Sequence, residues 1–311
     1  MYVIKMKTLI CYFAVFVLTL ASIGIIKIHY NPESQQNAAV IAEGAPSDSQ
    51  IADSPSSTAL FRKDSDSEID VPILMYHSVL RSSSGNGKYV ISESAFEKDL
   101  KYLADNGYTT VVMQDLIDYV YNGKQLPEKP VILTFDDGYF NNYAYAFPLL
   151  QKYNSKAVLS IIGYYTDLYT NSPDENPLYS HVTWKDVNAM IETGWVEVQN
   201  HSYNLHTTDK GRNGSKRKRG ESLESYKKML TEDLGKLQEQ FKINTGYYPT
   251  TYAYPFGSVS NDSFDIIKEM GFKASLSCEA GMNHISRDPE SLYMLKRYLR
   301  TPDKSAEAIL K

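Results

Sequence analysis

The sequence predicts an α/β domain in which helices cover a parallel sheet that is either open or closed into a barrel. Three observations support this class. From residue 71 onward, short apolar runs of strand length alternate with longer segments of helical period. Glycine and polar residues separate these runs. The chain has 311 residues, of which 42% are hydrophobic and 22% charged, enough for one large core or two small ones. Strand and helix in alternation are typical of parallel sheets.

Each element follows from its own apolar pattern. Strands are expected at residues 71–76, 109–113, 131–135, 157–162, 195–199, 251–254 and 273–277. Helices are expected at residues 94–106, 114–121, 143–153, 184–193, 223–241 and 263–270. In the first of these helices, Phe96, Leu100 and Leu103 share one face and Gly107 follows the end.

The N-terminal part precedes the folded domain. Lys5 and Lys7 are followed by an uncharged run, residues 8–26, that would reach about 28 Å as a helix, close to the roughly 30 Å of a bilayer core. Residues 1–30 are therefore expected to be a single transmembrane anchor with a cytoplasmic N-terminus, or else a cleaved signal segment. Residues 31–70 are rich in Ser, Asp, Pro and Ala, which predicts a disordered linker.

Residues 71–311 form the expected folded domain. It would lie outside the cell on the membrane, or be secreted if the first segment is cleaved. The formal net charge of −5 argues against a nucleic-acid partner. The two cysteines, Cys11 and Cys278, form no thiolate cluster, so any metal must have nitrogen and oxygen ligands.

Polar residues gather where the expected strands end. Asp136 and Asp137 follow one strand, His77 another, and His201 with His206 a third. Carboxyl ends of parallel strands meet at one edge of a sheet, where chemistry concentrates. Two imidazoles and one carboxylate are the ligands of a catalytic zinc-like site, in which the remaining coordination positions of the metal ion are open to water. The alternatives are a hydrogen-bonded histidine pair and an Asp-Asp-Gly turn without catalytic function.

These motifs resemble a known family. The segments "PILMYHSV", "LTFDDGY", "TWKDVNAMIETGWVEVQNHSYNLH", "YAYPFG" and "DPESLYMLKR" are similar to the polysaccharide deacetylase family, carbohydrate esterase family four, and especially to its poly-N-acetylglucosamine deacetylase branch. The resemblance extends over residues 71–300. It implies a distorted (β/α) barrel and metal-dependent removal of acetyl groups from N-acetylated sugars.

The resemblance also implies roles for individual residues. Asp136 is the expected general base, and Asp137, His201 and His206 are the expected ligands of a divalent metal ion, Zn²⁺ first, with Co²⁺ or Ni²⁺ as alternatives. The backbone N–H of Phe256, after Pro255, is expected to stabilise the oxyanion.

Two departures from the family pattern leave questions open. Ala253 occupies the position where many relatives carry the arginine that orients the base, which predicts that this orienting group is missing. The later motif "LYMLKRYLR" has no histidine to act as general acid. His77 is the expected substitute, and a purely structural His77 is the alternative.

The expected function is metal-dependent deacetylation of an N-acetylglucosamine polysaccharide by a monomeric enzyme tethered to the membrane. The aromatic residues Trp184, Tyr203 and Tyr254, with Pro255, are expected to bind the sugar, although core packing is the alternative. Two other functions remain open: deacetylation of peptidoglycan or chitin oligomers, and glycan binding without catalysis.

Overall fold

The structure is a computed structural model, and it describes residues 68–82 and 87–311. The expected anchor, residues 1–30, and almost all of the expected linker, residues 31–70, lie outside the described residues. Among the helices of the described part, none has both the length and the apolar character needed to cross a membrane. The anchor therefore stays a prediction from the sequence.

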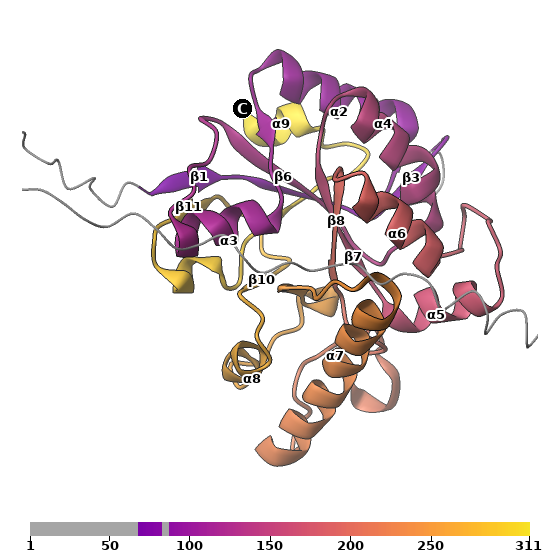
Figure 1. Cartoon of the computed structure of the whole chain (residues 1–311), viewed down its shortest axis with the longest axis vertical. Coiled ribbons are helices and arrows are strands. Elements are labelled where there is room, and N and C mark those ends of the chain that lie inside the picture. Colours follow the sequence, from indigo (N-terminus) through magenta and orange to yellow (C-terminus); the bar gives the residue numbers. More distant parts are fainter. Residues whose placement is uncertain (1–67, 83–86) are drawn as a thin grey trace, which may run out of the picture. The chain divides into compact units, whose positions relative to one another are not determined.

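A curled sheet of eight parallel strands forms the centre of the domain (Figure 1). The strand order is β10-β9-β8-β7-β6-β2-β12, with β5 paired to β6. The strands are β2 (Ile73–Tyr76), β5 (Thr109–Thr110), β6 (Pro130–Phe135), β7 (Ala157–Ile161), β8 (Val196–Asn200), β9 (Thr251–Ala253), β10 (Ala274–Leu276) and β12 (Tyr298–Leu299). The predicted parallel sheet is confirmed, and its curvature makes it a half-barrel.

One C-terminal segment, residues 295–299, contacts both ends of this strand path. Leu295 donates its N–H to the carbonyl of Ser275 at 2.8 Å, and Ser277 donates to the carbonyl of Leu295 at 2.9 Å, at the β10 end. A few residues later, β12 pairs with β2 at the other end. The same short segment therefore links the two ends of the curled sheet.

The helices lie around the outside of this sheet (Figure 1). They are α2 (Glu93–Asp105), α3 (Met113–Asn122), α4 (Phe147–Lys152), α5 (Gly163–Asn171), α6 (Trp184–Glu192), α7 (Leu223–Thr245), α8 (Ser263–Glu269) and α9 (Ala306–Leu310). Where one helix is expected at residues 143–153, the structure has a π-helical turn, Asn142–Ala146, followed by α4 with a proline in its first turn. That proline lacks an N–H, which suits a helix start and disfavours a helix interior. Helix α5 is not expected from the sequence, because its buried residues, Gly163 and Thr166, give no apolar stripe.

Two small strand pairs flank the sheet. Strand β1 (Ile69–Val71) pairs antiparallel with β11 (Asn283–Ile285), and β3 (Ser78–Leu80) pairs parallel with β4 (Val90–Ser92). The expected strand at residues 71–76 is divided at Pro72, which has no N–H to donate to a neighbouring strand. The first described strand, β1, begins two residues before residue 71, the predicted start of the domain.

The central strand β6 shows how the sequence builds the core and then the site. Val131, Leu133 and Phe135 belong to one hydrophobic cluster, and Ile132 belongs to a second cluster on the other face. A strand buried on both faces is expected to be apolar throughout, as in parallel sheets covered by helices. Its apolar run ends at Phe135, and the first two residues beyond it are Asp136 and Asp137.

Candidate active site

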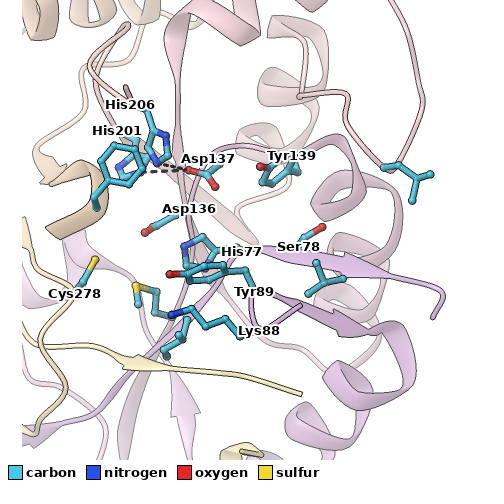
Figure 2. Close-up of a pocket in the computed structure, with 15 residues that line it drawn as sticks. His77, Ser78, Lys88, Tyr89, Asp136, Asp137, Tyr139, His201, His206 and Cys278 are labelled. Carbon is cyan, nitrogen blue, oxygen red and sulfur yellow. Dashed lines mark ion pairs between the residues drawn. The ribbon is translucent and has the colours of Figure 1, made fainter. Parts of the chain in front are cut away.

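The polar ends of β2, β6 and β8 meet in one pocket with a volume of about 560 Å³ (Figure 2). The lining residues are Met75, His77, Ser78, Lys88, Tyr89, Val90, Asp136, Asp137, Tyr139, Leu178, His201, His206, Phe256, Cys278 and Leu299. The prediction that separate strand ends share one face of the domain is therefore confirmed. Both aspartates and the three histidines singled out from the sequence line the same cavity.

Asp137, His201 and His206 form a compact group of potential metal ligands. One ligand atom from each residue lies within 4.8 Å of the others. Oδ1 of Asp137 is 3.5 Å from Nε2 of His201 and 3.2 Å from Nε2 of His206 (Figure 2). This Oδ1 atom is buried and has no hydrogen-bond partner among the described residues. Two imidazole nitrogens and one carboxylate oxygen, drawn together around an unsatisfied buried oxygen, fit a divalent metal ion.

The backbone around this group determines which atoms face it. Nδ1 of His201 lies 2.8 Å from the carbonyl oxygen of Ala253 and donates to it when protonated, which leaves Nε2 free as a ligand. Asp233 of α7 accepts hydrogen bonds from the N–H groups of Tyr203 and Asn204, at 2.8 and 2.9 Å. These two bonds fix the loop that joins His201 to His206.

The two neighbouring aspartates point in different directions because the chain turns between them. Asp137 and Gly138 both have positive φ, 72° and 75°. This conformation is uncommon for a residue with a side chain. At Gly138 a Cβ atom would lie 3.0 Å from Cγ2 of Ile161, so the close turn requires glycine. Asp137 can therefore face the histidines while Asp136 faces a different partner.

That partner is Arg297. Its guanidinium donates to both carboxylate oxygens of Asp136, at 2.7 and 2.8 Å, and the side chains of both residues are buried. Burial alone would raise the pKa of Asp136, but the charges of Arg297 and His201 outweigh it and hold this pKa well below its usual range. The carboxylate is thus ionised and fixed in orientation, as a general base requires.

Arg297 corrects one expectation from the sequence. Ala253 does occupy the position of the usual arginine, but a guanidinium partner for Asp136 is not missing, because Arg297 in the segment 295–299 supplies it. Arg297 lies within the stretch "DPESLYMLKR" that carries part of the family resemblance. Nothing in the local pattern of that stretch indicates that its arginine reaches the end of β6.

His77 lies in the same pocket as both aspartates (Figure 2). Its Nδ1 atom is buried without a hydrogen-bond partner among the described residues, and its ring centroid is 4.7 Å from that of Tyr89. Burial lowers the pKa of His77 from its ordinary value, although the charges of Asp136 and Asp137 act in the opposite direction. The imidazole lies in the same pocket as both aspartates, and its role as a proton donor stays a prediction.

Phe256 follows β9 in a tight turn, Pro255–Gly257. Its backbone has a positive φ of 58°, which is rare for an aromatic residue and is seen most often at functional sites. Its ring packs against that of His206 at a tilt of 48°, with centroids 4.1 Å apart, and Phe256 is 46% exposed. Phe256 therefore contacts a potential metal ligand and forms part of the pocket rim.

The aromatic residues expected to bind sugar lie elsewhere. Tyr254 is fully buried, with its hydroxyl 2.7 Å from Oγ of Ser263. Trp184 and Tyr203 both donate to the carboxylate of Asp167, at 2.8 and 3.0 Å. These three side chains and Pro255 are absent from the pocket lining, which is a correction to the expected placement. Tyr89, Tyr139 and Leu178 line the pocket instead, and the sequence pattern had not singled them out.

Comparison with known proteins agrees with this geometry. Residues 123–275 match the family model described as polysaccharide deacetylase. The Bacillus subtilis protein YxkH, whose name assigns it provisionally to the polysaccharide deacetylases, is 30% identical over 238 residues, covering 76% of this chain and 74% of YxkH. The chain therefore belongs to the polysaccharide deacetylase family.

Two further relatives are named as N-deacetylases. The poly-beta-1,6-N-acetyl-D-glucosamine N-deacetylase of Escherichia coli K12 is 25% identical over 232 residues, and the alignment covers 69% of this chain but only 34% of the relative. This chain thus matches about a third of that protein's length. A de-N-acetylase from Aggregatibacter actinomycetemcomitans has a solved structure with a TM-score of 0.66 and 27% identity, covering 78% of this chain and 99% of that one.

Proposed function

We propose that this protein is a metal-dependent N-deacetylase that hydrolyses acetyl groups from N-acetylglucosamine units of a polysaccharide at the cell surface. One observation carries the proposal: the Asp137, His201 and His206 group lies in the same pocket as an Asp136 held by Arg297. Membership of the polysaccharide deacetylase family and the named function of the E. coli relative support the reaction and the sugar.

The metal ion would be held by Asp137, His201 and His206, with Zn²⁺ as the first candidate. When bound, such an ion polarises a carbonyl oxygen and lowers the pKa of a water molecule toward neutrality. The remaining chemistry is done by protein groups. Asp136, ionised and fixed by Arg297, accepts a proton as the oxygen of water attacks the amide carbonyl carbon.

The reaction then needs a charge stabiliser and a proton donor. In our proposal, the N–H of Phe256 donates to the oxygen of the carbonyl as negative charge develops there. The C–N bond breaks, and the leaving nitrogen must receive a proton to depart as an amine. We assign this step to His77, the imidazole in the same pocket that is not part of the ligand group. The products are acetate and a glucosamine unit.

Acetate release tests this function. Purified protein loaded with Zn²⁺ should release acetate from β-1,6-linked N-acetylglucosamine oligomers, with chitin oligomers and peptidoglycan as competing substrates. Asp136→Asn should lower the rate on the order of 10²-fold or more while retaining metal. Release from chitin or peptidoglycan alone would reassign the substrate. Oligomer binding without any release would establish a glycan-binding protein instead.

The location at the cell surface depends on the apolar run at residues 8–26. Full-length protein should sediment with membranes, and a chain starting near residue 68 should be soluble and active. Recovery of a mature N-terminus near Ser22 would show cleavage and secretion in place of anchoring.

A further inference from the structure

Helix α5 exposes its large side chains and buries its small ones. The buried residues of this helix are Gly163 and Thr166. Three large residues are exposed instead, Tyr164, Tyr165 and Leu168, at 42%, 36% and 42%. Helices on the surface of a globular domain normally bury their large apolar residues and expose polar ones. A group of large apolar residues exposed together is typical of a binding surface. We refer to these three exposed residues as the α5 surface.

The first turn of α5 lies next to the loop that carries the two histidines of the candidate ligand group. Strand β7, which leads into α5, lies between β6 and β8 in the sheet. The N–H of Gly163 donates to the carbonyl of Ser202 at 3.1 Å, and the N–H of Tyr164 donates to the carbonyl of Tyr203 at 2.8 Å. These backbone hydrogen bonds hold the α5 surface at the same edge of the sheet as the catalytic pocket.

A row of aromatic rings connects the α5 surface with the lining of that pocket. Tyr139 lines the pocket near Asp137 (Figure 2), and its ring centroid is 4.7 Å from that of His181. The ring of His181 in turn lies 4.4 Å from that of Tyr165, and the rings of Tyr165 and Tyr164 are 5.4 Å apart. The two exposed tyrosines therefore reach the pocket lining through one intervening ring.

The row has an exposed apolar neighbour at the pocket and a covered ring at its other end. Leu178, three residues before His181, is 66% exposed and lines the catalytic pocket. Beyond Tyr164, the next ring is that of Tyr203, 6.4 Å away between centroids. The ammonium group of Lys236 lies 3.7 Å from the centroid of this last ring. The apolar exposure thus extends from the pocket rim to Tyr164 and ends at Tyr203.

The charges around the α5 surface favour a sugar chain over a membrane. Residues 163–180 contain three acidic residues, Asp167, Asp174 and Glu175, and no lysine or arginine. Helices that lie on membranes are rich in Lys and Arg, which attract anionic lipids. A neutral sugar chain, or one whose free amines carry positive charge, meets no such repulsion. Tyrosine also suits a sugar, because its ring offers an apolar face and its hydroxyl both donates and accepts hydrogen bonds.

We propose that the α5 surface binds sugar units of the polysaccharide that neighbour the unit held in the catalytic pocket. The inference rests on the proposed function, because it takes an N-acetylglucosamine polymer as the bound chain. One unit of the polymer occupies the catalytic pocket, and units further along the same chain pack on the rings of Tyr165 and Tyr164. Long oligomers therefore bind more tightly than short ones, and this preference for length depends on the two tyrosines.

Calorimetry with β-1,6-linked N-acetylglucosamine oligomers tests the α5 surface without turnover, in Zn²⁺-loaded protein that carries Asp136→Asn. The hexamer should bind more tightly than the dimer. In this parent protein, Tyr164→Ala and Tyr165→Ala should each weaken hexamer binding about three- to tenfold, the range expected for the loss of one stacked ring, and should affect the dimer less. Tyr164→Phe and Tyr165→Phe keep the rings and should bind the hexamer nearly as the parent does.

Tyr248→Ala is the matched control. Tyr248 is 47% exposed, and it precedes β9, so it lies at the opposite edge of the sheet from the catalytic pocket. The proposal is overturned if the hexamer and the dimer bind equally well, or if both alanine variants bind the hexamer as the parent and Tyr248→Ala do. In that case, weaker sedimentation with vesicles or weaker self-association in the alanine variants would assign the surface to a membrane or to a second copy of the chain.

Kinetics separate this inference from the proposed function. With Asp136 intact, Tyr164→Ala and Tyr165→Ala should raise KM for acetate release from the hexamer more than they lower kcat, because neither residue contacts the reacting atoms. If no acetate is released but hexamer affinity depends on both tyrosines, the proposed function fails and the sugar-binding surface stands. If acetate is released and the alanine variants match Tyr248→Ala in hexamer affinity and KM, the surface fails and the proposed function stands.

Discussion

Arg297 and Asp136 are 161 positions apart in the chain, yet two parallel hydrogen bonds of 2.7 and 2.8 Å join them in a buried pair. Bidentate pairs of this kind fix both distance and orientation. The carboxylate of Asp136 therefore cannot rotate freely. The guanidinium of Arg297 compensates its negative charge, while the neighbouring Asp137 lies beside His201 and His206. This arrangement allows two adjacent acids to have different functions.

The first prediction concerns this pair. Arg297→Lys keeps a positive charge but cannot form both hydrogen bonds, so kcat/KM should fall about tenfold or more. Because Arg297 lowers the pKa of Asp136, weaker contact should raise it, and the acidic limb of the pH profile should move to higher pH. Arg300→Lys is the matched control, since Arg300 forms a similar buried pair with Asp99. An unshifted acidic limb in Arg297→Lys would contradict the orienting role.

The second prediction concerns the metal ion. Chelation should abolish acetate release, and Zn²⁺ or Co²⁺ should restore it. His206→Ala removes a ligand that is partly exposed, so the protein should remain folded but lose bound metal. Added Zn²⁺ should raise the Tm of wild type, because a metal ion that binds the folded state stabilises it. The Tm of His206→Ala should not change, because this variant should no longer bind the ion. Full activity in protein shown to be free of metal would refute the assignment.

A third prediction separates the proton donor from the base. A donor must be protonated, so kcat/KM should fall as pH rises through the pKa of His77, which burial places below its ordinary value of 6.5. His77→Asn should remove this alkaline limb and lower the rate on the order of 10²-fold while retaining metal. His284→Asn, at an exposed histidine paired with Asp70, should change neither. If His77→Asn keeps the alkaline limb, another group donates the proton.

The fourth prediction concerns stability away from the site. Glu197 of β8 accepts hydrogen bonds from the N–H of Gln114 and the side chain of Gln199, at 3.0 and 2.6 Å, and burial raises its pKa from 4.5 to about 7. The folded state therefore holds this proton more tightly than the unfolded state does. The stabilisation that the folded state gains from this tighter proton binding is complete below pH 4.5 and is lost as pH rises through about 7.

Glu197→Gln cannot ionise, so it should lose less stability than wild type between about pH 5 and pH 8. The difference should be at most about 3 kcal/mol in the free energy of unfolding, measured with urea at both pH values. Glu128→Gln, at an exposed residue just before β6, should follow wild type. Equal pH dependence in Glu197→Gln and wild type would show that this carboxyl group titrates normally in the folded protein.

Much of the architecture could be predicted because it follows from local patterns. The apolar run of β6 and the helical spacing of Phe96, Leu100 and Leu103 are visible in the sequence. The candidate ligand group could also be predicted, since Asp137 and His201 follow the ends of two strands of one parallel sheet, β6 and β8, and His206 lies in the turn after β8. Helix α5 could not be predicted in this way, because few of its side chains are buried.

The misplaced aromatic residues and Arg297 have a common cause. The sequence shows that Tyr254 is near the site but not whether its ring faces the pocket or the core, and in the structure it is fully buried. Likewise, Arg297 reaches Asp136 only because residues 295–299 link the two ends of the sheet. Such contacts depend on the whole fold, and a pattern over a few neighbouring residues does not contain them.

The link made by residues 295–299 also sets an order of assembly. The proposed metal ligands all precede residue 207, so the part of the chain that carries them is synthesised before the segment that contains Arg297. A ribosome-bound chain lacking residues 295–299 could already carry a metal ion, but its Asp136 would have no guanidinium partner. In the proposed mechanism, the base would therefore be oriented only when β12 joins the sheet.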